Sequence, residues 1–392
     1  MTSLSSFDDP SDDPLLLRGR DAELVREWLS LFLPGVEGIV VRRCPAGLSG
    51  ADVFRCDTLL GPFALKGWPA GTPSARVDEV HDVIRRSHDC LSVVPRLVPS
   101  VFGMTRLSCE ARHYELASWM PGEPLGDVGV SGGGISEGDT TQVGSGSVDL
   151  LDGIARGAAV IARFHDSTGC WGEADAPPPA VLRRLGRIDE LRRELPEALE
   201  RATAPTETLQ RAADWLRRFG EGGLLAAADR LGKWATRMVP LRIVLRDVHR
   251  GHLLFQQGVP SGLVDFDAIG RDTIATDLAR WVGDFLRAPA PAAAGKSVLF
   301  PGVAESATSC RNVLDADAIW QAAWRGYGQA SKICEEELEL SRAIAAASPV
   351  IVLANWVTWT HLEQRDFTGC WEQVDRRVSD ILLTMTAGLP FA

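Results

Sequence analysis

Apolar residues in the first 120 positions follow two different spacings. Leu24, Val25, Trp28, Leu29 and Phe32 recur at helical spacing, whereas several short runs are apolar and β-branched, as in strands. The expected helices cover residues 22–32 and 74–87. The expected strands cover residues 38–42, 53–56, 62–68, 97–102 and 114–122. This pattern predicts a small, mostly β unit with one packed helix.

Helical periodicity dominates after residue 150. The expected helices cover residues 150–165, 180–201 and 207–237, and helices resume from residue 276 to the end. Short β-like runs at 242–245, 253–255 and 262–266 interrupt them. A chain of 392 residues exceeds what one hydrophobic core usually holds. The expected fold is therefore α+β and bilobal, with a β-rich N-terminal lobe at 21–118 and a larger, mainly helical C-terminal lobe at 119–392.

Two segments have compositions that do not support a packed core. Residues 1–20 form an acidic start, and Gly and Ser dominate residues 126–147. Such segments bury too little apolar surface to offset the entropy of ordering. We expect a disordered tail at 1–20 and a flexible insertion at 126–147.

Charge and composition narrow the class of partner. The net charge is -11 and the isoelectric point is near 5.2, which opposes a nucleic-acid partner because such binding relies on Lys and Arg. The acidic balance would instead favour a cationic small molecule. The start lacks a basic, apolar leader, and the most apolar late stretch, 343–359, is interrupted and short for a bilayer. We expect a cytoplasmic protein with no membrane partner.

The eight cysteines carry no metal-binding pattern. No C-x-x-C pair or His/Cys cluster has zinc-ligand spacing. We expect reduced, mostly buried thiols.

Two aspartates stand beside apolar β-like runs in the second lobe. Asp247 lies in VLRDVHRGHLLF and Asp265 in GLVDFD, so that a hairpin between them would bring both carboxylates to one end. Phosphoryl transfer uses such a pair, one to accept the proton of the acceptor hydroxyl and one to hold Mg²⁺. The alternative interpretation is two ordinary aspartates at the edges of loops.

These segments resemble two motifs of the aminoglycoside phosphotransferase and choline/homoserine kinase family. LRDVHRGHLLF resembles its catalytic loop, and VDFDAIGRDTIATDLAR resembles its metal-binding motif. The match implies that Asp247 is the catalytic aspartate, Asp265 the principal metal ligand, and Asp277 a residue that braces the catalytic loop. It also implies a protein-kinase-like fold, ATP or GTP as phosphoryl donor, Mg²⁺ or Mn²⁺ as cofactor, and a small hydroxylated acceptor.

The motif departs from the family at two positions. Leu245 and Arg246 replace the usual His-Gly, and His252 replaces an asparagine that helps to hold metal. An imidazole suits a softer ion such as Mn²⁺ better than Mg²⁺, and Asp267 offers a further oxygen. The candidate metal residues are therefore Asp265, His252 and Asp267. A nucleotide-binding pseudokinase with weak or absent catalysis is the alternative function, and an enzyme of another class is a third.

The first lobe supplies candidate nucleotide residues. Small residues between two expected strands let backbone N–H groups approach phosphate, and a lysine follows on the next strand, as in kinase-like folds. These candidates are Gly47, Ser49, Gly50, Ala51 and Lys66.

The resemblance extends to the helix and the hinge of the first lobe. Glu79 is the first choice for the ion-pair partner of Lys66, with Asp78 and Asp82 as competitors. The backbone from Glu115 to Ala117 is expected to bond the adenine edge. Acceptor-binding helices vary in this family, so the sequence leaves an aminoglycoside, a choline-like amine, a homoserine-like amino acid and a sugar open as acceptors, together with the oligomeric state.

Overall fold

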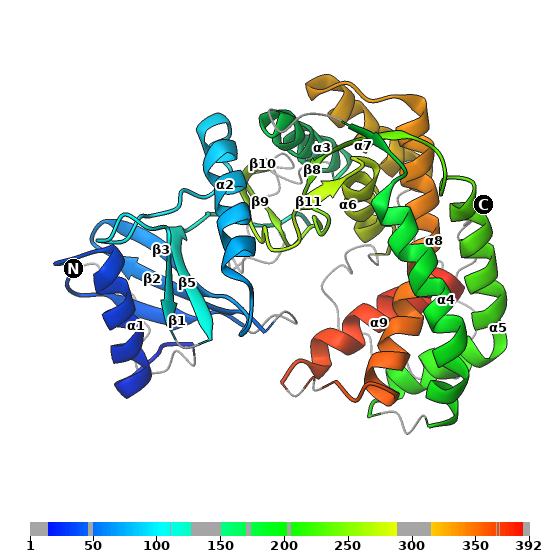
Figure 1. Cartoon of the computed structure of the whole chain (residues 1–392), viewed down its shortest axis with the longest axis horizontal. Helices are drawn as coiled ribbons and strands as arrows, with labels where there is room; N and C mark the ends of the chain where they lie inside the picture. The colour runs from blue at the N-terminus through cyan, green and yellow to red at the C-terminus, as the bar shows by residue number, and fades with distance from the viewer. Residues whose placement is uncertain are drawn as a thin grey trace, which may run out of the picture. The chain divides into compact units, whose positions relative to one another are not determined.

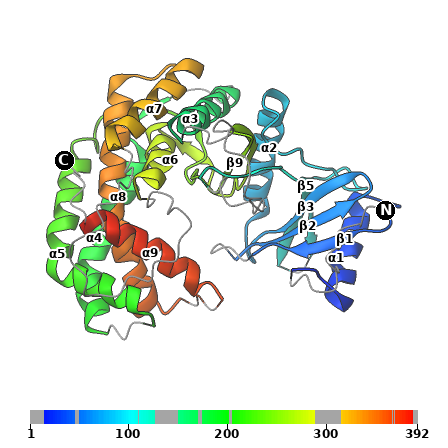
Figure 2. The same ribbon diagram turned by 180° about the vertical axis from the view of Figure 1, so that it is seen from behind.

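The computed structural model describes residues 15–45, 50–109, 111–126, 150–169, 174–201, 205–287, 315–365, 367 and 369–386. The chain divides into two compact units (Figures 1 and 2). Unit 1 comprises Met1–Asp89 and Val94–Met120, and unit 2 comprises Cys90–Val93 and Pro121–Ala392. All of the predicted insertion after Gly126, and most of the predicted tail, lie outside the described residues. Helix α1 begins at Gly19, inside the segment predicted as tail.

Unit 1 is built on one antiparallel sheet in the order β1-β2-β3-β5-β4. Its strands are β1 (Val40–Arg43), β2 (Asp52–Thr58), β3 (Gly61–Gly67), β4 (Arg106–Cys109) and β5 (Arg112–Ser118). Its helices are α1 (Gly19–Phe32) and α2 (Ser74–Cys90).

Helix α1 is part of the core of unit 1. Leu29, from the apolar face of α1, is buried in one cluster with Phe54, Leu65 and Leu116 from the sheet. Burial of such side chains stabilises the folded chain by about 1.5–3 kcal/mol each. Unit 1 therefore holds two packed helices in its described part, whereas the sequence pattern predicted one.

The predicted strand at 97–102 is not formed. Leu97 makes only an isolated bridge to Ala117, and Val101 and Phe102 are exposed in a turn. The strand that pairs with β5 is β4, which the apolar pattern did not predict because its residues are half-buried or exposed.

Unit 2 is mainly helical, with two small sheets in the orders β10-β9-β6 and β11-β8-β7. Its described helices are α3 (Leu150–Ser167), α4 (Pro179–Glu200), α5 (Glu207–Gly232), α6 (Ala275–Arg287), α7 (Ala316–Ala330), α8 (Glu335–His361) and α9 (Trp371–Thr386). Its described strands are β6 (Glu123–Pro124), β7 (Ala174–Ala176), β8 (Val239–Val244), β9 (Leu253–Gln256), β10 (Val259–Leu263) and β11 (Gly270–Asp272). The two units together give the expected α+β, protein-kinase-like fold.

Helix α8 is long and apolar enough to span a membrane by length and composition alone. Two-thirds of its most apolar window, 67%, is buried inside the protein, and α8 packs against α4, α5 and α6. The apolar composition is thus that of a core helix.

The cysteines differ from the expectation of mostly buried thiols. All six in the described residues are free, but only Cys56 is buried. Burial raises the pKa of Cys56 to about 12, so this thiol is protonated and acts as a small apolar core residue.

Candidate active site

The loop that carries Asp247 lies between β8 and β9, next to the segment that carries Asp265. Strands β9 and β10 form an antiparallel hairpin in which Leu253 lies opposite Leu263. Beyond the hairpin, Val264 N donates to the carbonyl oxygen of His252 at 2.9 Å. The expected hairpin is present, and it brings the two aspartate-bearing segments together.

Asp277, near the start of α6, holds the loop that carries Asp247. Its fully buried carboxylate accepts from Leu245 N at 2.7 Å, from Arg246 N at 2.6 Å and from His165 Nε2 at 2.9 Å. On the other side of the His165 ring, Nδ1 lies 2.9 Å from the Tyr327 hydroxyl. The predicted bracing contact is confirmed, and it extends through His165 to α7.

Two residues of the site have left-handed backbone conformations. The φ angle is 67° at Arg246 and 63° at Asp265, values that are uncommon for residues other than glycine. Such conformations persist where the surrounding structure fixes them, and they gather at functional sites. The bond from Arg246 N to Asp277 is one such restraint.

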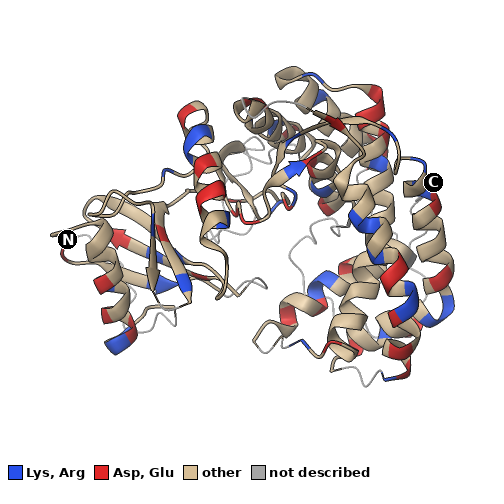
Figure 3. Ribbon diagram, viewed as in Figure 1, with Lys and Arg blue, Asp and Glu red and all other residues tan. Residues whose placement is uncertain are grey.

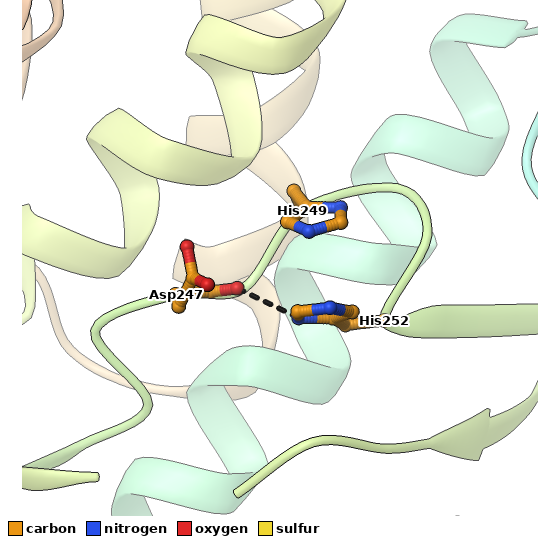
Figure 4. Close-up of side chains that lie close together, drawn as sticks. All are labelled: Asp247, His249 and His252. Atoms are coloured by element: carbon orange, nitrogen blue, oxygen red, sulfur yellow. Dashed lines mark hydrogen bonds between the residues drawn. The ribbon is translucent and has the colours of Figure 1, made fainter. Parts of the chain in front are cut away.

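Asp247 is held by two neighbours. Arg280 of α6 donates to Asp247 Oδ1 from Nε at 2.8 Å, and its Nη2 lies 2.7 Å from the same oxygen in an ion pair. The backbone oxygen of Asp247 accepts from His252 Nδ1 at 2.9 Å (Figure 4). Gly251 N donates to Nδ1 of His249, whose ring centroid lies 3.7 Å from that of His252. Burial, aided by His252 and Arg280, lowers the pKa of His249 to about 2, so this ring is neutral.

His252 and Asp265 bring two potential ligand atoms for a divalent cation close together. Because a carbonyl oxygen only accepts, His252 Nδ1 carries a proton, and the neutral tautomer with this proton has a lone pair on Nε2. That Nε2 lies 3.5 Å from Asp265 Oδ2. A ligating imidazole usually donates its other N–H to a carbonyl or a carboxylate, as this one does. The residues fit a divalent cation. Asp267 follows in the next turn and is half-buried.

Lys66 on β3 lies directly opposite Glu115 on β5. The Glu115 carboxylate is buried, and its Oε2 lies 2.6 Å from both Trp68 Nε1 and His81 Nε2. Burial raises the pKa of Glu115, but His81, Lys66 and Trp68 together hold it below its usual range. Glu115 is therefore a buried carboxylate beside Lys66.

Glu79 does not take the predicted position beside Lys66. It points outward and pairs with Arg76 at 2.6 Å, while Asp78 pairs with Arg106 at 2.6 Å. Asp82 likewise pairs with Arg85 at 2.5 Å. The buried face of α2 consists of Val77, Val80, His81, Val83, Ile84 and Ser87. This helical phase turns His81 inward. The carboxylate beside Lys66 is therefore that of Glu115 on β5 and not one from α2.

The backbone from Glu115 to Ala117, which was predicted to bond the adenine edge, makes hydrogen bonds within the sheet. These residues are inside β5, where Glu115 and Ala117 pair with β3 and the Leu116 carbonyl accepts from Val98 N at 2.8 Å. The chain leaves the sheet at Trp119. Of the phosphate-loop candidates, Gly50 has a φ of 74° and Ala51 precedes β2, whereas Gly47 and Ser49 lie outside the described residues.

The sequence analysis did not predict a cluster of arginines that lies beside Asp247. A cavity of about 320 Å³ in unit 2 is lined by Asp247 and by Arg183, Arg184, Arg187, Arg246 and Arg280. Three of these arginines follow helical spacing in LRRLGR on α4, and this local signal could have found them. Figure 3 shows where Lys and Arg lie along the helices of unit 2.

The sheet that carries Lys66, together with the braced aspartate loop, defines a protein-kinase-like architecture. The chain belongs to the phosphotransferase enzyme family, whose model matches residues 40–299, more than half of its length. No curated protein matches its sequence.

Solved structures support the same fold at low sequence identity. An amicoumacin kinase is 14% identical with a TM-score of 0.54, and the match covers 92% of this chain and 93% of the kinase. A spectinomycin phosphotransferase is 11% identical with a TM-score of 0.55, covering 93% and 98%. An aminoglycoside phosphotransferase from Alicyclobacillus acidocaldarius is 11% identical with a TM-score of 0.52, covering 92% and 93%.

Proposed function

We propose that this protein transfers the γ-phosphoryl group of ATP to a hydroxyl group of a small molecule. The observation that carries the proposal is the clamp of Asp277 on Leu245 N and Arg246 N, which fixes the loop bearing Asp247 at the cavity. Family membership supports it. The structures of the amicoumacin kinase and the spectinomycin phosphotransferase, determined with AMP-PNP and with ADP respectively, are consistent with a nucleotide donor.

Asp247 is proposed to orient the acceptor hydroxyl and take its proton. Arg280 occupies Oδ1, and Oδ2 has no partner among the described residues, so Oδ2 is the oxygen available to the hydroxyl. The acceptor oxygen bonds to the γ-phosphorus, the bond from that phosphorus to the β,γ-bridging oxygen breaks, and ADP leaves.

Asp265 and His252 are proposed to hold the divalent cation, with Asp267 as a further oxygen donor. When bound, such a cation neutralises charge on the nucleotide phosphates. Mg²⁺ prefers oxygen ligands, whereas an imidazole also suits Mn²⁺. We expect Mn²⁺ to support the reaction at least as well as Mg²⁺.

Lys66 is proposed to contact the nucleotide phosphates, with Glu115 as its positioning residue. Because Glu115 is buried and held by Trp68 and His81, it offers Lys66 a fixed counter-charge. The adenine edge is proposed to bond the backbone that follows Ser118. The backbone groups of residues 115–117 are already hydrogen-bonded within the sheet.

The test is ADP release over a panel of hydroxylated acceptors, comparing the wild type with Asp247→Asn. Loss of the catalytic base should lower turnover by about a hundredfold or more. The matched control is Asp214→Asn, at an exposed residue of α5 paired with Arg217, which should leave turnover unchanged. Equal turnover in Asp247→Asn would remove Asp247 from the reaction.

One observation favours a second function, a nucleotide-binding protein without catalysis: His252 replaces the expected asparagine. That function predicts tight ATP binding with a cation and no ADP release by the wild type with any acceptor.

A further inference from the structure

The cavity at Asp247 is unusually basic for a protein with a net charge of -11. Helix α4 contributes Arg183, Arg184 and Arg187, and the remaining two arginines come from the catalytic loop and from α6. Asp247 is the only acidic residue that lines the cavity in the described part of the chain.

Two of the cavity arginines share one carboxylate. Arg183 forms an ion pair with the fully buried Asp272, and Arg246 Nε lies 3.6 Å from the same carboxylate oxygen. The charge of Arg280 is matched by Asp247.

Among the described residues, no carboxylate forms an ion pair with Arg184. Within the described part of the chain its side chain makes one hydrogen bond, to the carbonyl oxygen of Ala180 at 3.1 Å. Burial lowers the pKa of Arg184 to about 10; Asp272 opposes this shift, and the cations Arg183 and Arg280 add to it. An anion beside Arg184 would relieve this crowding of positive charge.

Arg187 faces a different environment. It pairs with Glu190 at 2.9 Å and with Glu194 at 3.0 Å, and its Nε donates to Asn355 Oδ1 at 2.7 Å. Because the Asn355 oxygen is used, its Nδ2 amino group is left as a neutral donor at the cavity.

The wall formed by α8 is partly apolar. Ile344, Ile351 and Val352 line the cavity from this helix. Apolar walls exclude water and strengthen electrostatic interactions beside them. A ligand of this cavity should thus combine a hydrocarbon frame with a localised negative charge, whereas a polycation would meet like charges.

We propose that the acceptor is a small hydroxylated anion whose carboxylate or phosphate group binds Arg184 and Arg183 while its hydroxyl lies at Asp247. The proposal rests on the proposed function and names the substrate class of the same site. Guanidinium groups bind both anions through paired N–H donors. The phosphoryl transfer itself is unchanged: the hydroxyl proton goes to Asp247, the new oxygen–phosphorus bond forms, and ADP departs.

A binding experiment tests the pocket without any catalytic step. Inorganic phosphate, tartrate and glucosamine are titrated by calorimetry into the full chain at low ionic strength, without nucleotide. We expect phosphate, tartrate or both to bind and glucosamine not to bind, and comparison of the two anions distinguishes phosphate from carboxylate recognition. Binding of glucosamine with no binding of either anion, or no binding at all, would overturn the proposal.

Variants of α4 test whether Arg184 binds the anion. Arg184→Gln should weaken anion binding by about tenfold to a hundredfold, since a buried charge-assisted bond is lost. Arg184→Lys keeps the positive charge but not the paired N–H donors of the guanidinium, and it should lose less anion affinity than Arg184→Gln. The control Arg192→Gln, at a residue of α4 paired with Glu221 and remote from the cavity lining, should bind as the wild type does. Equal affinity in Arg184→Gln would contradict the assignment.

An acceptor panel separates this inference from the proposed function. Glucosamine, glucose and glucuronate share a pyranose frame with positive, neutral and negative charge, and glucose 1-phosphate adds a phosphate. Transfer to the anionic members supports the inference. Transfer to glucosamine or glucose alone would overturn it and leave the phosphotransferase function standing. If ATP neither binds nor turns over, the proposed function fails, and the calorimetric result alone decides for or against the anion site.

Discussion

The guanidinium group of Arg280 donates a hydrogen bond from Nε to Asp247 Oδ1 at 2.8 Å, and its Nη2 forms an ion pair with the same oxygen at 2.7 Å. Under the proposed function, this contact orients the Asp247 carboxylate and leaves its second oxygen for the acceptor, so that Arg280 is a positioning residue. A variant of Arg280 should therefore separate the orientation of Asp247 from the binding of ATP.

Arg280→Gln should lower kcat by about tenfold to a hundredfold with a smaller change in the KM for ATP, because the loss falls on the orientation of Asp247. Steady-state kinetics of both substrates measure this. Arg217→Gln, at an exposed arginine paired with Asp214, is the control. A change in the KM for ATP alone would show that Arg280 serves nucleotide binding instead.

Asp277→Asn should destabilise the fold, because an amide cannot accept from Leu245 N, Arg246 N and His165 as the carboxylate does. We expect a loss of about 3 kcal/mol in the free energy of unfolding, measured by chemical denaturation. Tyr327→Phe removes the hydroxyl on the far side of His165 and should cost about 1–2 kcal/mol. A loss below about 0.5 kcal/mol in Asp277→Asn would contradict a bracing role.

Glu115→Gln should destabilise unit 1 near neutral pH by about 2 kcal/mol, since it removes the buried charge that His81, Lys66 and Trp68 stabilise. The folded pKa of Glu115 is depressed, so its contribution is present above the unfolded value near 4.5 and is lost as the pH falls through the folded value. The difference between the wild type and Glu115→Gln should therefore shrink below about pH 4.5 in denaturation curves measured at several pH values. Glu79→Gln, at the exposed partner of Arg76, should change stability by less than about 0.5 kcal/mol. The reverse ranking of the two variants would restore Glu79 as the partner of Lys66.

Gly326→Ala should disturb the contact between α3 and α7. A Cβ at Gly326 would lie 1.9 Å from the Ala155 carbonyl oxygen, a distance that requires the helices to separate. We expect a loss of about 1–3 kcal/mol in thermal or chemical unfolding. Gly222→Ala on α5 meets open space and should be neutral or slightly stabilising. Equal stability of the two variants would argue against tight packing of α3 on α7.

His252→Asn should change the metal preference, because it replaces an imidazole nitrogen with an amide oxygen beside Asp265. Mg²⁺-supported activity should rise relative to Mn²⁺-supported activity, measured as the ratio of initial rates. Loss of activity with every metal would instead give His252 a dedicated role of its own.

The structure of the loop that carries Asp247 was predictable because its residues lie close together in the chain. The motifs around Asp247, Asp265 and Asp277 predicted the order of loop, hairpin and helix. Pairing between nearby residues, such as β9 with β10 and Leu245 N with Asp277, then brings these segments together. The fold class followed from the same segments and from the change of apolar spacing after residue 150.

The partner of Lys66 was not predictable in the same way. The buried positions Val77, Val80 and Ile84 determine which face of α2 points toward the core. The number of residues between Lys66 and Glu79 does not determine that face. Glu115 comes from another strand, and only the register of β3 on β5 sets it opposite Lys66. The cavity arginines likewise come from three separate segments, which only tertiary packing brings together.

The most direct test of the phosphotransferase function is calorimetric titration of ATP into the wild type and Asp265→Asn, in Mg²⁺, in Mn²⁺ and in EDTA. If Asp265 holds a nucleotide-bound cation, the wild type should bind ATP at least about tenfold more tightly with a divalent ion than in EDTA, a difference of about 1.4 kcal/mol. The variant should lose that difference. Equal affinity of the wild type in all three conditions, or an unchanged metal dependence in Asp265→Asn, would contradict it.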